Sequence, residues 1–591
     1  MKKWMQPLLA SLNKKETSIF NCVFVVLVIF RIWLISGIPM LFIYGIHDEL
    51  FFAKAAHYII HNQWMGPYNQ MTLIKAPFYS FFMALSFFTG LPLFINETIF
   101  FITACILLFF VFTPLIENRW WRLLLFTVVL YCPASLITYT NIRIYREFVY
   151  FSVTLYVVSF SIGVFLRLNR KISVLFLWST GLGLSMGAFM ITREEGVWIY
   201  PILFLLLLSC LLCIWLRKVD QKIKRSFLIL LPILLWQIPG FITSSLNYYH
   251  YDFFGVTEQL DPDFNRVLST LSRIKTNGKW HPAIKITKEA RMKAYEASPI
   301  LYEMKDAIES AVINKWNIYD DISMAYKPDW YLSQYSNGGS EIGAHFLWLF
   351  RDVVYDKGYY ASGKYPHQFY KQLADQLESA CNNGKLDCSP TQKIPLIGEI
   401  DRRYYPIILR MFFEGGVRLL RLDYTEMVSL DINKWPNWPK NNDEFKYFEE
   451  FAYNSINGPG IRSGLYPQYS INEQTDMRLK ILFYKEKMMV QIYNIYKGIT
   501  AAVFIAGFSA WIFLSISKRR RESQEQYLIV SLFLIGLFFS RLMTLAVVDA
   551  TTSIGGIYFY GSSNYLFIYI FSFLMLNWMF KYKIYRKQVE V

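Results

Sequence analysis

Long runs of apolar residues recur along the 591-residue chain, and polar segments separate them. A run of about 20 apolar residues can cross the roughly 30 Å hydrocarbon core of a bilayer as a helix. Helices and closed barrels alone satisfy their backbone hydrogen bonds in that environment, so these runs predict an all-α polytopic membrane protein. We expect about ten transmembrane helices, at Ile19–Met40, Thr98–Ile116, Leu123–Ile137, Phe148–Leu166, Val174–Ile191, Val197–Leu216, Phe227–Ser244, Ile499–Ile516, Tyr527–Val548 and Tyr565–Phe580.

An eleventh run, Ala76–Phe94, is as apolar as several of the ten but contains Gly90 and Pro92. With ten spans and a cytoplasmic N-terminus, the cytoplasmic segments hold 22 Lys and Arg residues, and the short segments on the other side hold five. This excess follows the positive-inside rule. An eleventh span would send the later basic loops outward, so we expect Ala76–Phe94 to lie at, or dip into, the outer interface.

The same topology divides the chain into three parts. Residues 1–246 form a transmembrane module of spans one to seven, and residues 492–591 carry spans eight to ten. Residues 247–491 form an extracytoplasmic domain whose helix-like stretches predict an α-rich structure. Within it, Cys381 and Cys388 lie in the polar stretch "CNNGKLDC", where a disulfide can form if the compartment is oxidising.

Composition narrows the functional classes. The chain is 54% hydrophobic and only 18% charged, which excludes a soluble protein of this size. Its formal net charge of +16 is explained by basic cytoplasmic loops, so we expect no nucleic-acid partner. The sequence contains no Walker, GxGxxG, HExxH or CxxC pattern.

Four polar clusters on the predicted outer side are not explained by topology. Each has a structural alternative: an aspartate that caps a helix, a lysine that snorkels to the interface, or a hydrated loop that pairs its own charges. Inside the spans, Arg31 and Arg541 need partners or a route to water, and we interpret Arg31 as structural. The clusters are "HDELFF" with Asp48 and Glu49, "TLIKAPFY" with Lys75, "NIRIYRE" with Arg143, Arg146 and Glu147, and "ITREEGVW" with Arg193, Glu194 and Glu195.

Together these clusters combine two kinds of chemistry. Carboxylates can take a proton from a hydroxyl or bind a divalent cation through oxygen ligands. Arginine and lysine bind phosphate, arginine by paired hydrogen bonds and lysine as a point charge. Both kinds of group at a membrane surface suit a substrate that carries a phosphate on a lipid tail.

The Asp48-Glu49 pair after the first span, followed by "WMGPYNQMTLIKAPFY" with Lys75 and Pro77, resembles the GT-C superfamily of integral-membrane glycosyltransferases. This superfamily includes the protein O-mannosyltransferases and the lipid A aminoarabinose transferases. The resemblance covers roughly residues 19–245 and implies two juxtamembrane helices in the first outer loop. It also implies sugar transfer from a polyprenyl-phosphate or diphosphate donor to a hydroxyl of an extracytoplasmic glycan, lipid or protein, in the bacterial plasma (inner) membrane.

The resemblance further implies roles for individual residues. Asp48 would be the general base, and Glu49 would assist it, bind a metal or cap the helix. No cofactor is certain, and a divalent cation, Mg²⁺ or Mn²⁺, would use Asp48, Glu49 and Glu147. Ile74 stands where aminoarabinose transferases have an acidic residue, so their substrate is not carried over. The donor phosphate would be held by Lys75, Arg143, Arg146 and Arg193, with Glu147, Glu194 and Glu195 as supporting acids.

Three other functions remain open at this point, one of which is a member of the superfamily that has lost catalysis and acts as a scaffold, although Asp48 is retained. An O-antigen polymerase or ligase also uses polyprenyl diphosphate, but its main functional residues would lie in later large loops. A transporter of lipid-linked glycans would carry intramembrane charge pairs and related halves, and the sequence indicates neither.

Overall fold

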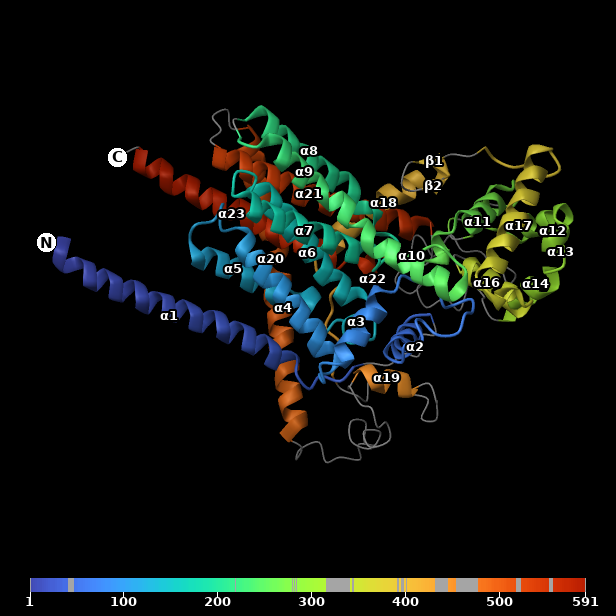
Figure 1. Cartoon of the computed structure of the whole chain (residues 1–591), viewed down its shortest axis with the longest axis horizontal. Coiled ribbons are helices and arrows are strands. Elements are labelled where there is room, and N and C mark those ends of the chain that lie inside the picture. Colours follow the sequence, from blue (N-terminus) through green and yellow to red (C-terminus); the bar gives the residue numbers. More distant parts are fainter. Residues whose placement is uncertain are drawn as a thin grey trace.

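The computed structural model describes residues 2–40, 47–217, 219–278, 280, 282, 284–314, 341–342, 345–390, 393–394, 398–399, 401–430, 445–452, 477–516, 522–551 and 556–589. The architecture is a bundle of long helices with a helical unit at one end (Figure 1). Within the described ranges, nine segments are long and apolar enough to cross a membrane. They are Glu16–Ile35 of α1 (Lys2–Ile35), α4 (Leu93–Val111), α6 (Glu147–Leu166), α7 (Ile172–Met190), η2 with α8 (Gly196–Ile199, Tyr200–Leu216), α9 with α10 (Lys222–Leu235, Gln237–Tyr251), and parts of α20 (Met477–Ile516), α21 (Glu522–Thr551) and α23 (Ser563–Val589).

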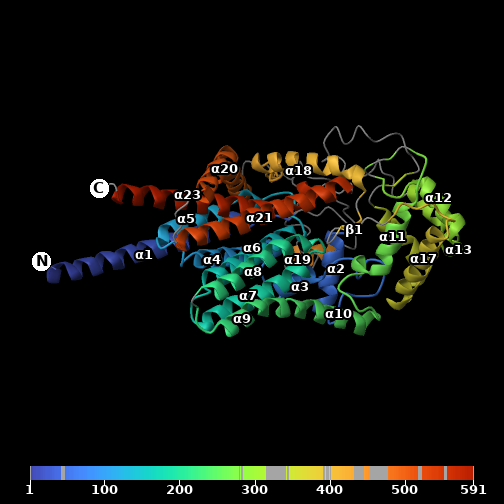
Figure 2. The ribbon, with the colours of Figure 1, turned by 90° about the horizontal axis from the view of Figure 1, so that it is seen from above.

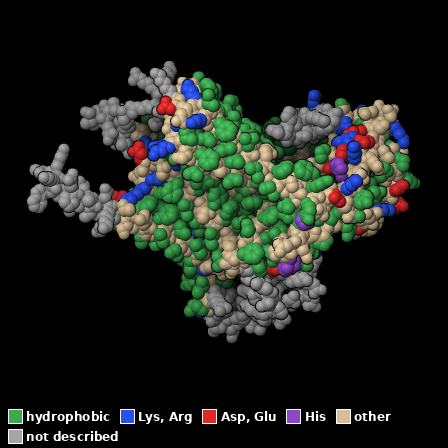
Figure 3. Space-filling model, viewed as in Figure 1, with side chains coloured by type: hydrophobic (Ala, Val, Ile, Leu, Met, Phe, Trp, Pro, Cys, Tyr) green, Lys and Arg blue, Asp and Glu red, His purple; other side chains and the backbone are tan. Residues whose placement is uncertain are grey.

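Hydrophobic side chains cover the middle of the bundle in a broad band, while charged side chains gather toward its two ends (Figure 3). Large apolar residues of the membrane helices are strongly exposed, for example Leu177 of α7 at 67% and Leu216 of α8 at 82%. A surface of this kind is stable against lipid, so the structure confirms the predicted fold class of a multi-pass helical membrane protein.

The third predicted span, Leu123–Ile137, differs from its prediction. The helix α5 (Arg119–Leu130) has 12 residues, about 18 Å, and the chain then continues through the short η1 (Pro133–Ser135). Proline lacks a backbone N–H, so helical hydrogen bonding stops there. The third predicted span is therefore a 12-residue helix followed by irregular backbone, and it is not among the nine described segments that are long and apolar enough to cross a membrane.

Irregular backbone at membrane depth requires partners from the protein itself. Arg31 donates to the carbonyl of Ser135, and Asn141 Nδ2 donates to the carbonyls of Ala134 and Leu136 at 2.8 and 2.9 Å. The buried Arg31 thus has the structural contact that its position in a membrane helix demanded.

The first loop after α1 contains the two expected juxtamembrane helices, α2 (Glu49–Ile60) and α3 (Phe78–Phe87). Helix α3 has only 10 residues, about 15 Å, and cannot span a bilayer. Gly90, at φ +74°, turns the chain, and Pro92 precedes the first residue of α4. The run Ala76–Phe94 is therefore not a span of its own, as the charge pattern predicted.

The two predicted groups of loops lie at opposite ends of the bundle. At one end, which carries both termini in Figure 1, Arg119 pairs with Glu16 at 2.9 Å and Arg217 pairs with Glu525 at 2.6 Å. The other end carries α2, α3 and the helical unit. We call it the outer end, because the charge pattern predicts that it is extracytoplasmic.

The helical unit at the outer end has its own hydrophobic core. The Cys381–Cys388 disulfide links the end of the last helix of the unit to the segment that follows it. Among the described residues the only sheet is a two-stranded antiparallel pair, β1 (Lys393–Ile394) and β2 (Gly398–Glu399). The unit contains η3 (Glu258–Leu260), α11 (Pro262–Arg273), α12 (Lys288–Ala297), α13 (Pro299–Tyr302), α14 (Lys305–Asn314), α16 (Phe346–Asp356), η6 (Tyr359–Ala361) and α17 (Lys364–Asn382).

Part of the region between α10 and α20 returns to the membrane helices. Helix α18 (Tyr405–Leu420), which follows η7 (Arg402–Tyr404), lies along α21 (Figure 2). Helix α19 (Phe445–Ala452) packs against α2, and α22 (Gly556–Tyr560) connects α21 to α23. The outer end is thus assembled from segments far apart in the sequence.

Candidate active site

The four polar clusters predicted from the sequence meet at the outer end of the bundle. Asp48 precedes α2, and Glu49 is its first residue. Lys75 lies in the turn before α3, and Glu147 begins α6. The remaining cluster, residues 193–195, occupies the short turn between α7 and η2. All nine predicted site residues therefore lie in loops or at the first residue of a helix at the outer end of the bundle.

These residues form ion pairs that cross from one cluster to another. Asp48 pairs with Lys75, and Glu49 pairs with Arg143. Arg143 also lies over the ring of Tyr139, 4.9 Å from its centroid. The first pair joins two parts of the first outer loop, and the second joins the start of α2 to the loop before α6, so the pairs fix the position of the first outer loop.

Arg146 ties three segments together. Its guanidinium donates two hydrogen bonds to Glu194, at 3.0 and 2.8 Å, and a third to the carbonyl of Thr192 at 2.9 Å. Glu194 in turn accepts from the backbone N–H of Ala76 at 2.7 Å. This paired, bidentate geometry is the strong form of an arginine–carboxylate contact.

Arg193 lies between two carboxylates, Glu147 and Glu195, and its Nε is 2.7 Å from Glu195. Its guanidinium is also 3.8 Å from the centroid of the Tyr560 ring. Arg541 of α21 is 3.8 Å from the same Glu195 carboxylate and donates to the carbonyl of Tyr560 at 3.1 Å.

Three members of this site were not assigned to it from the sequence. Arg541 gave a signal, because an arginine within an apolar run needs a partner. Tyr560 and Ser562, which donates to Glu147, gave none. They lie in the connection between α21 and α23, where the sequence carries no charge to mark them.

Exposure separates the five carboxylates. The Asp48 side chain is 33% exposed, whereas Glu49 and Glu147 are 0% exposed and Glu194 is 8% exposed. Glu195 is 23% exposed but lies between Arg193 and Arg541. Asp48 is therefore the carboxylate of the site that a substrate can reach most readily.

The charges of the site alter the pKa values of its acids. Burial raises the pKa of Asp48, but Lys75, with smaller contributions from Arg143 and Arg146, lowers it to about 2. For Glu49 the effect of burial exceeds that of Arg143, so its pKa lies above the usual range. Asp48 is thus ionised at neutral pH, and its low pKa depends on Lys75 more than on any other cation.

Aromatic side chains lie beside the Asp48–Lys75 pair. The His47 ring stacks on Trp348 of α16, with centroids 4.4 Å apart and planes at 18°. The ammonium of Lys75 lies 5.3 Å from the Phe52 ring centroid and 6.0 Å from that of Trp348. Burial, assisted by Lys75, lowers the pKa of His47 to about 4, so this ring is neutral at neutral pH.

Hydrogen bonds hold the helical unit against this loop. Arg351 of α16 donates to the carbonyl of Gln70 from Nε at 3.1 Å, and it also pairs with Glu258. The backbone N–H of Glu258 donates to the carbonyl of Leu73 at 2.8 Å, two residues before Lys75. These contacts hold α16, and with it Trp348, next to the loop that carries Lys75.

The carboxylates proposed as metal ligands face different cations. Asp48 contacts Lys75, Glu49 contacts Arg143, and Glu147 contacts Arg193. They do not form a close ligand set among the described residues.

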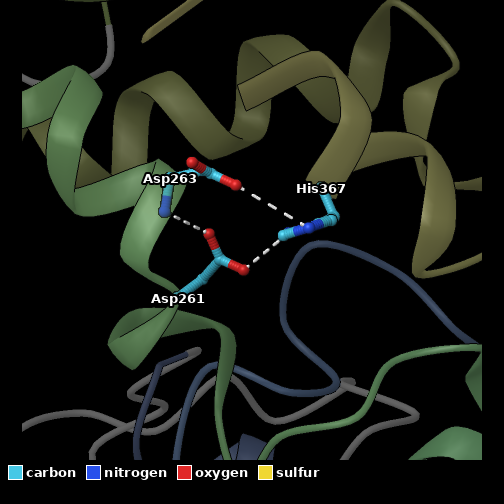
Figure 4. Close-up of side chains that lie close together, drawn as sticks. All are labelled: Asp261, Asp263 and His367. Carbon is cyan, nitrogen blue, oxygen red and sulfur yellow. Dashed lines mark hydrogen bonds and ion pairs between the residues drawn. The ribbon is translucent and has the colours of Figure 1, made fainter. Parts of the chain in front are cut away.

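A triad at the start of α11 has ligand atoms within 4.8 Å of one another: Asp261, Asp263 and His367 (Figure 4). Asp261 caps α11 by accepting from the N–H groups of Asp263 and Phe264, both at 2.9 Å, and it pairs with His367 at 2.8 Å. Asp263 pairs with Arg266 at 2.6 Å. These contacts explain the triad without an ion.

No protein-family model and no curated protein matches the chain. Two solved structures match it: ArnT from Cupriavidus metallidurans in the apo state, and the same protein bound to undecaprenyl phosphate. The first has 10% sequence identity and a TM-score of 0.29, over 91% of this chain and 78% of that one. The second has 10% identity and a TM-score of 0.28, over 92% and 77%. Neither score is high enough to support a conclusion about fold or function, so the conclusions below rest on the geometry of this chain.

The geometry predicts different consequences for the two adjacent acids. Glu49→Gln leaves the buried Arg143 without its countercharge, which costs about 3–5 kcal/mol of folding free energy. Asp48→Asn also removes the countercharge of a buried cation, Lys75, but Asp48 itself is one-third exposed and water can reach its position, so this variant should cost less than Glu49→Gln. Thermal unfolding of the two purified variants in the same detergent checks this. Equal melting temperatures would contradict the structural role of Glu49.

Proposed function

We propose that the chain is a membrane glycosyltransferase that moves a sugar from a polyprenyl-phosphate or diphosphate donor to a hydroxyl of an extracytoplasmic acceptor. The observation that carries this proposal is the position of Asp48, an ionised and accessible carboxylate beside Lys75, at the outer end of a bundle of membrane helices. A carboxylate beside a cation that can change partners suits a reaction in which the carboxylate removes a proton while the cation stabilises a leaving phosphate.

The proposed step is a single displacement. Asp48 accepts the proton of the acceptor hydroxyl, and the acceptor oxygen forms a bond to C1 of the sugar. The bond between C1 and the phosphate oxygen breaks, and its electron pair leaves with the lipid phosphate. The configuration at C1 inverts. Cations near the leaving phosphate stabilise the negative charge that grows in the transition state.

Donor binding requires an exchange of partners. Lys75, Arg143, Arg146 and Arg193 each contact a carboxylate in this structure, so a phosphate must compete with an existing pair. Lys75 is the most readily exchanged, because its partner Asp48 is the most exposed acid of the site. The three arginines pair with acids that are 0% or 8% exposed, so they hold the loops in place.

This exchange would activate the base. Lys75 is the cation that lowers the pKa of Asp48 most. Burial raises the pKa of Asp48, and the nearby positive charges lower it. When Lys75 moves to the donor phosphate, one of these charges is withdrawn, and the pKa of Asp48 rises toward neutrality. A carboxylate with a higher pKa is a stronger base, so donor binding prepares Asp48 for the proton transfer.

Consumption of donor tests the proposed reaction. Purified protein in proteoliposomes, given radiolabelled polyprenyl-phosphate sugars and native acceptor extract, should consume a donor. Asp48→Asn should lower the rate about 10²–10⁴-fold, because proton transfer by a positioned carboxylate contributes that much. Asp356→Asn, an exposed acid at the end of α16, is the matched control and should keep the wild-type rate. Full activity of Asp48→Asn would remove Asp48 from the mechanism, and no donor consumption by the wild type would favour a transporter.

The pH dependence of kcat/KM tests the coupling between Lys75 and Asp48. In the free protein the pKa of Asp48 is about 2, so the base stays ionised and the wild-type profile should be flat from about pH 4 to 8. Lys75→Met raises that pKa, so protonation begins at a higher pH and kcat/KM should fall toward pH 4. An unchanged profile shape in the variant, whatever its absolute rate, would show that Lys75 does not control the base.

The proposed step uses no divalent cation, because protein cations already neutralise Asp48, Glu49 and Glu147. We therefore expect the transfer rate to be unaffected by EDTA and by added Mg²⁺ or Mn²⁺. Loss of activity with EDTA, restored by either ion, would assign a metal to these carboxylates instead.

A further inference from the structure

A cavity of about 580 Å³ lies at the outer end, and none of its lining residues belongs to the candidate active site. Its walls come from the connection between α11 and α12, from η7, and from Thr551, the last residue of α21. A volume of this size is typical of pockets for small molecules or headgroups, roughly 300–1,000 Å³. Positive charge dominates the described part of the lining, where Asp401 is the one carboxylate against Arg273, Lys275, Lys285, Arg402 and Arg403.

The cations of this cavity are only partly neutralised. Lys275 pairs with Asp387 at 2.8 Å, and the Nε of Arg403 donates to Asp401 at 2.9 Å. The side chains of Lys285 and Arg402, however, have no hydrogen-bond or ion-pair partner among the residues that the structure describes. The candidate active site differs, since each of its cations contacts a carboxylate. Unpaired positive charge around a cavity indicates an anionic ligand.

The aromatic residues of the cavity are held in place. The rings of Trp280 and Tyr404 meet edge to face, with centroids 5.0 Å apart, and the Tyr404 hydroxyl donates to the carbonyl of Pro282 at 2.8 Å. The guanidinium of Arg403 lies 4.9 Å from the Trp280 ring centroid. The cavity therefore has one rigid apolar wall in addition to its positive charges.

An apolar stripe begins next to this cavity. Helix α18 follows directly on Tyr404, and its residues Tyr405, Leu409, Phe413 and Val417 are 43%, 52%, 67% and 49% exposed. Residues four apart lie on the same side of a helix, so these four form one continuous row. The other side of α18 packs on α21 and α22, where a Cβ on Gly415 would come within 2.5 Å of Ile557 and 3.4 Å of Leu542.

We propose that the cavity and the stripe together bind one phosphate-bearing lipid from the leaflet at the outer end. Its phosphate contacts Lys285 and Arg402, and its hydrocarbon chain lies along the α18 row. The charge of the cavity selects the phosphate, and the outer end of a membrane helix at Thr551 places the cavity at the level of lipid headgroups. This site is separate from the proposed transfer reaction and does not depend on it.

Native mass spectrometry of the full-length protein in detergent tests the proposal. Phosphatidylglycerol, phosphatidylcholine and soluble glycerol 3-phosphate are titrated in separate arms. We expect phosphatidylglycerol to bind most tightly, since it alone combines net negative charge with a hydrocarbon chain. The double variant Lys285→Ala/Arg402→Ala should weaken this binding at least about tenfold, because charge-assisted hydrogen bonds to phosphate are lost.

A second double variant tests the binding of the hydrocarbon chain separately from that of the headgroup, and a third serves as a control. Leu409→Ser/Phe413→Ser should weaken phosphatidylglycerol binding and leave glycerol 3-phosphate binding unchanged. Lys357→Ala/Lys364→Ala removes two exposed lysines elsewhere on the helical unit and should change neither. Equal weakening by this control and by Lys285→Ala/Arg402→Ala, or no weakening by the latter, would overturn the site. Glycerol 3-phosphate binding as tight as phosphatidylglycerol binding, with no effect of the α18 variant, would assign a soluble phosphorylated ligand instead of a lipid.

Discussion

The outer end of this protein depends on the pairing of buried charges. Taking an ion out of water costs several kcal/mol, and only a close countercharge with additional hydrogen bonds offsets this. Five carboxylates and five cations meet here: Asp48, Glu49, Glu147, Glu194 and Glu195 with Lys75, Arg143, Arg146, Arg193 and Arg541. Because the partners come from distant segments, their pairing fixes how the first outer loop, α6, α7 and α21 are arranged.

The same constraint explains how such a site can act on a charged substrate. A balanced cluster has no spare cation, so a phosphate can enter only where a pair is readily exchanged. Glu49 and Glu147 are fully buried with their arginines, whereas Asp48 is a third exposed. The buried pairs therefore serve as a rigid frame, and the Asp48–Lys75 pair is the one that can open. In the cavity beside η7, the side chains of Lys285 and Arg402 have no carboxylate partner among the described residues, which indicates binding without such an exchange.

Local patterns in the sequence predicted much of this arrangement. The apolar runs predicted the helical bundle, and the basic loops predicted that α3 is not a span. Both patterns can be recognised within about 20 neighbouring residues. The Cys381–Cys388 disulfide was open to prediction for the same reason, since a short polar turn joins the two cysteines. The broken third crossing was missed, because its irregular backbone is stabilised by Arg31, about 100 residues earlier in the chain.

Which charge pairs with which could not be read from the sequence. The four clusters identified nine of the site residues, but Arg193 finds Glu147 and Arg541 finds Glu195 only through the packing of α6, α7 and α21. Ser562 and Tyr560 carry no charge that would have marked them. The cavity proposed to bind a lipid could not be predicted from the sequence either, because Lys285, Arg402 and Thr551 come together only in the folded chain.

The partner of Lys75 when a lipid phosphate is bound is the central point of the mechanism. A cryo-electron microscopy structure of the full-length protein with a polyprenyl phosphate bound measures it directly. The account predicts that the Lys75 ammonium contacts the lipid phosphate and no longer contacts Asp48, while the Glu49–Arg143 and Glu147–Arg193 pairs remain. A phosphate bound at the site with Lys75 still paired to Asp48 would contradict it.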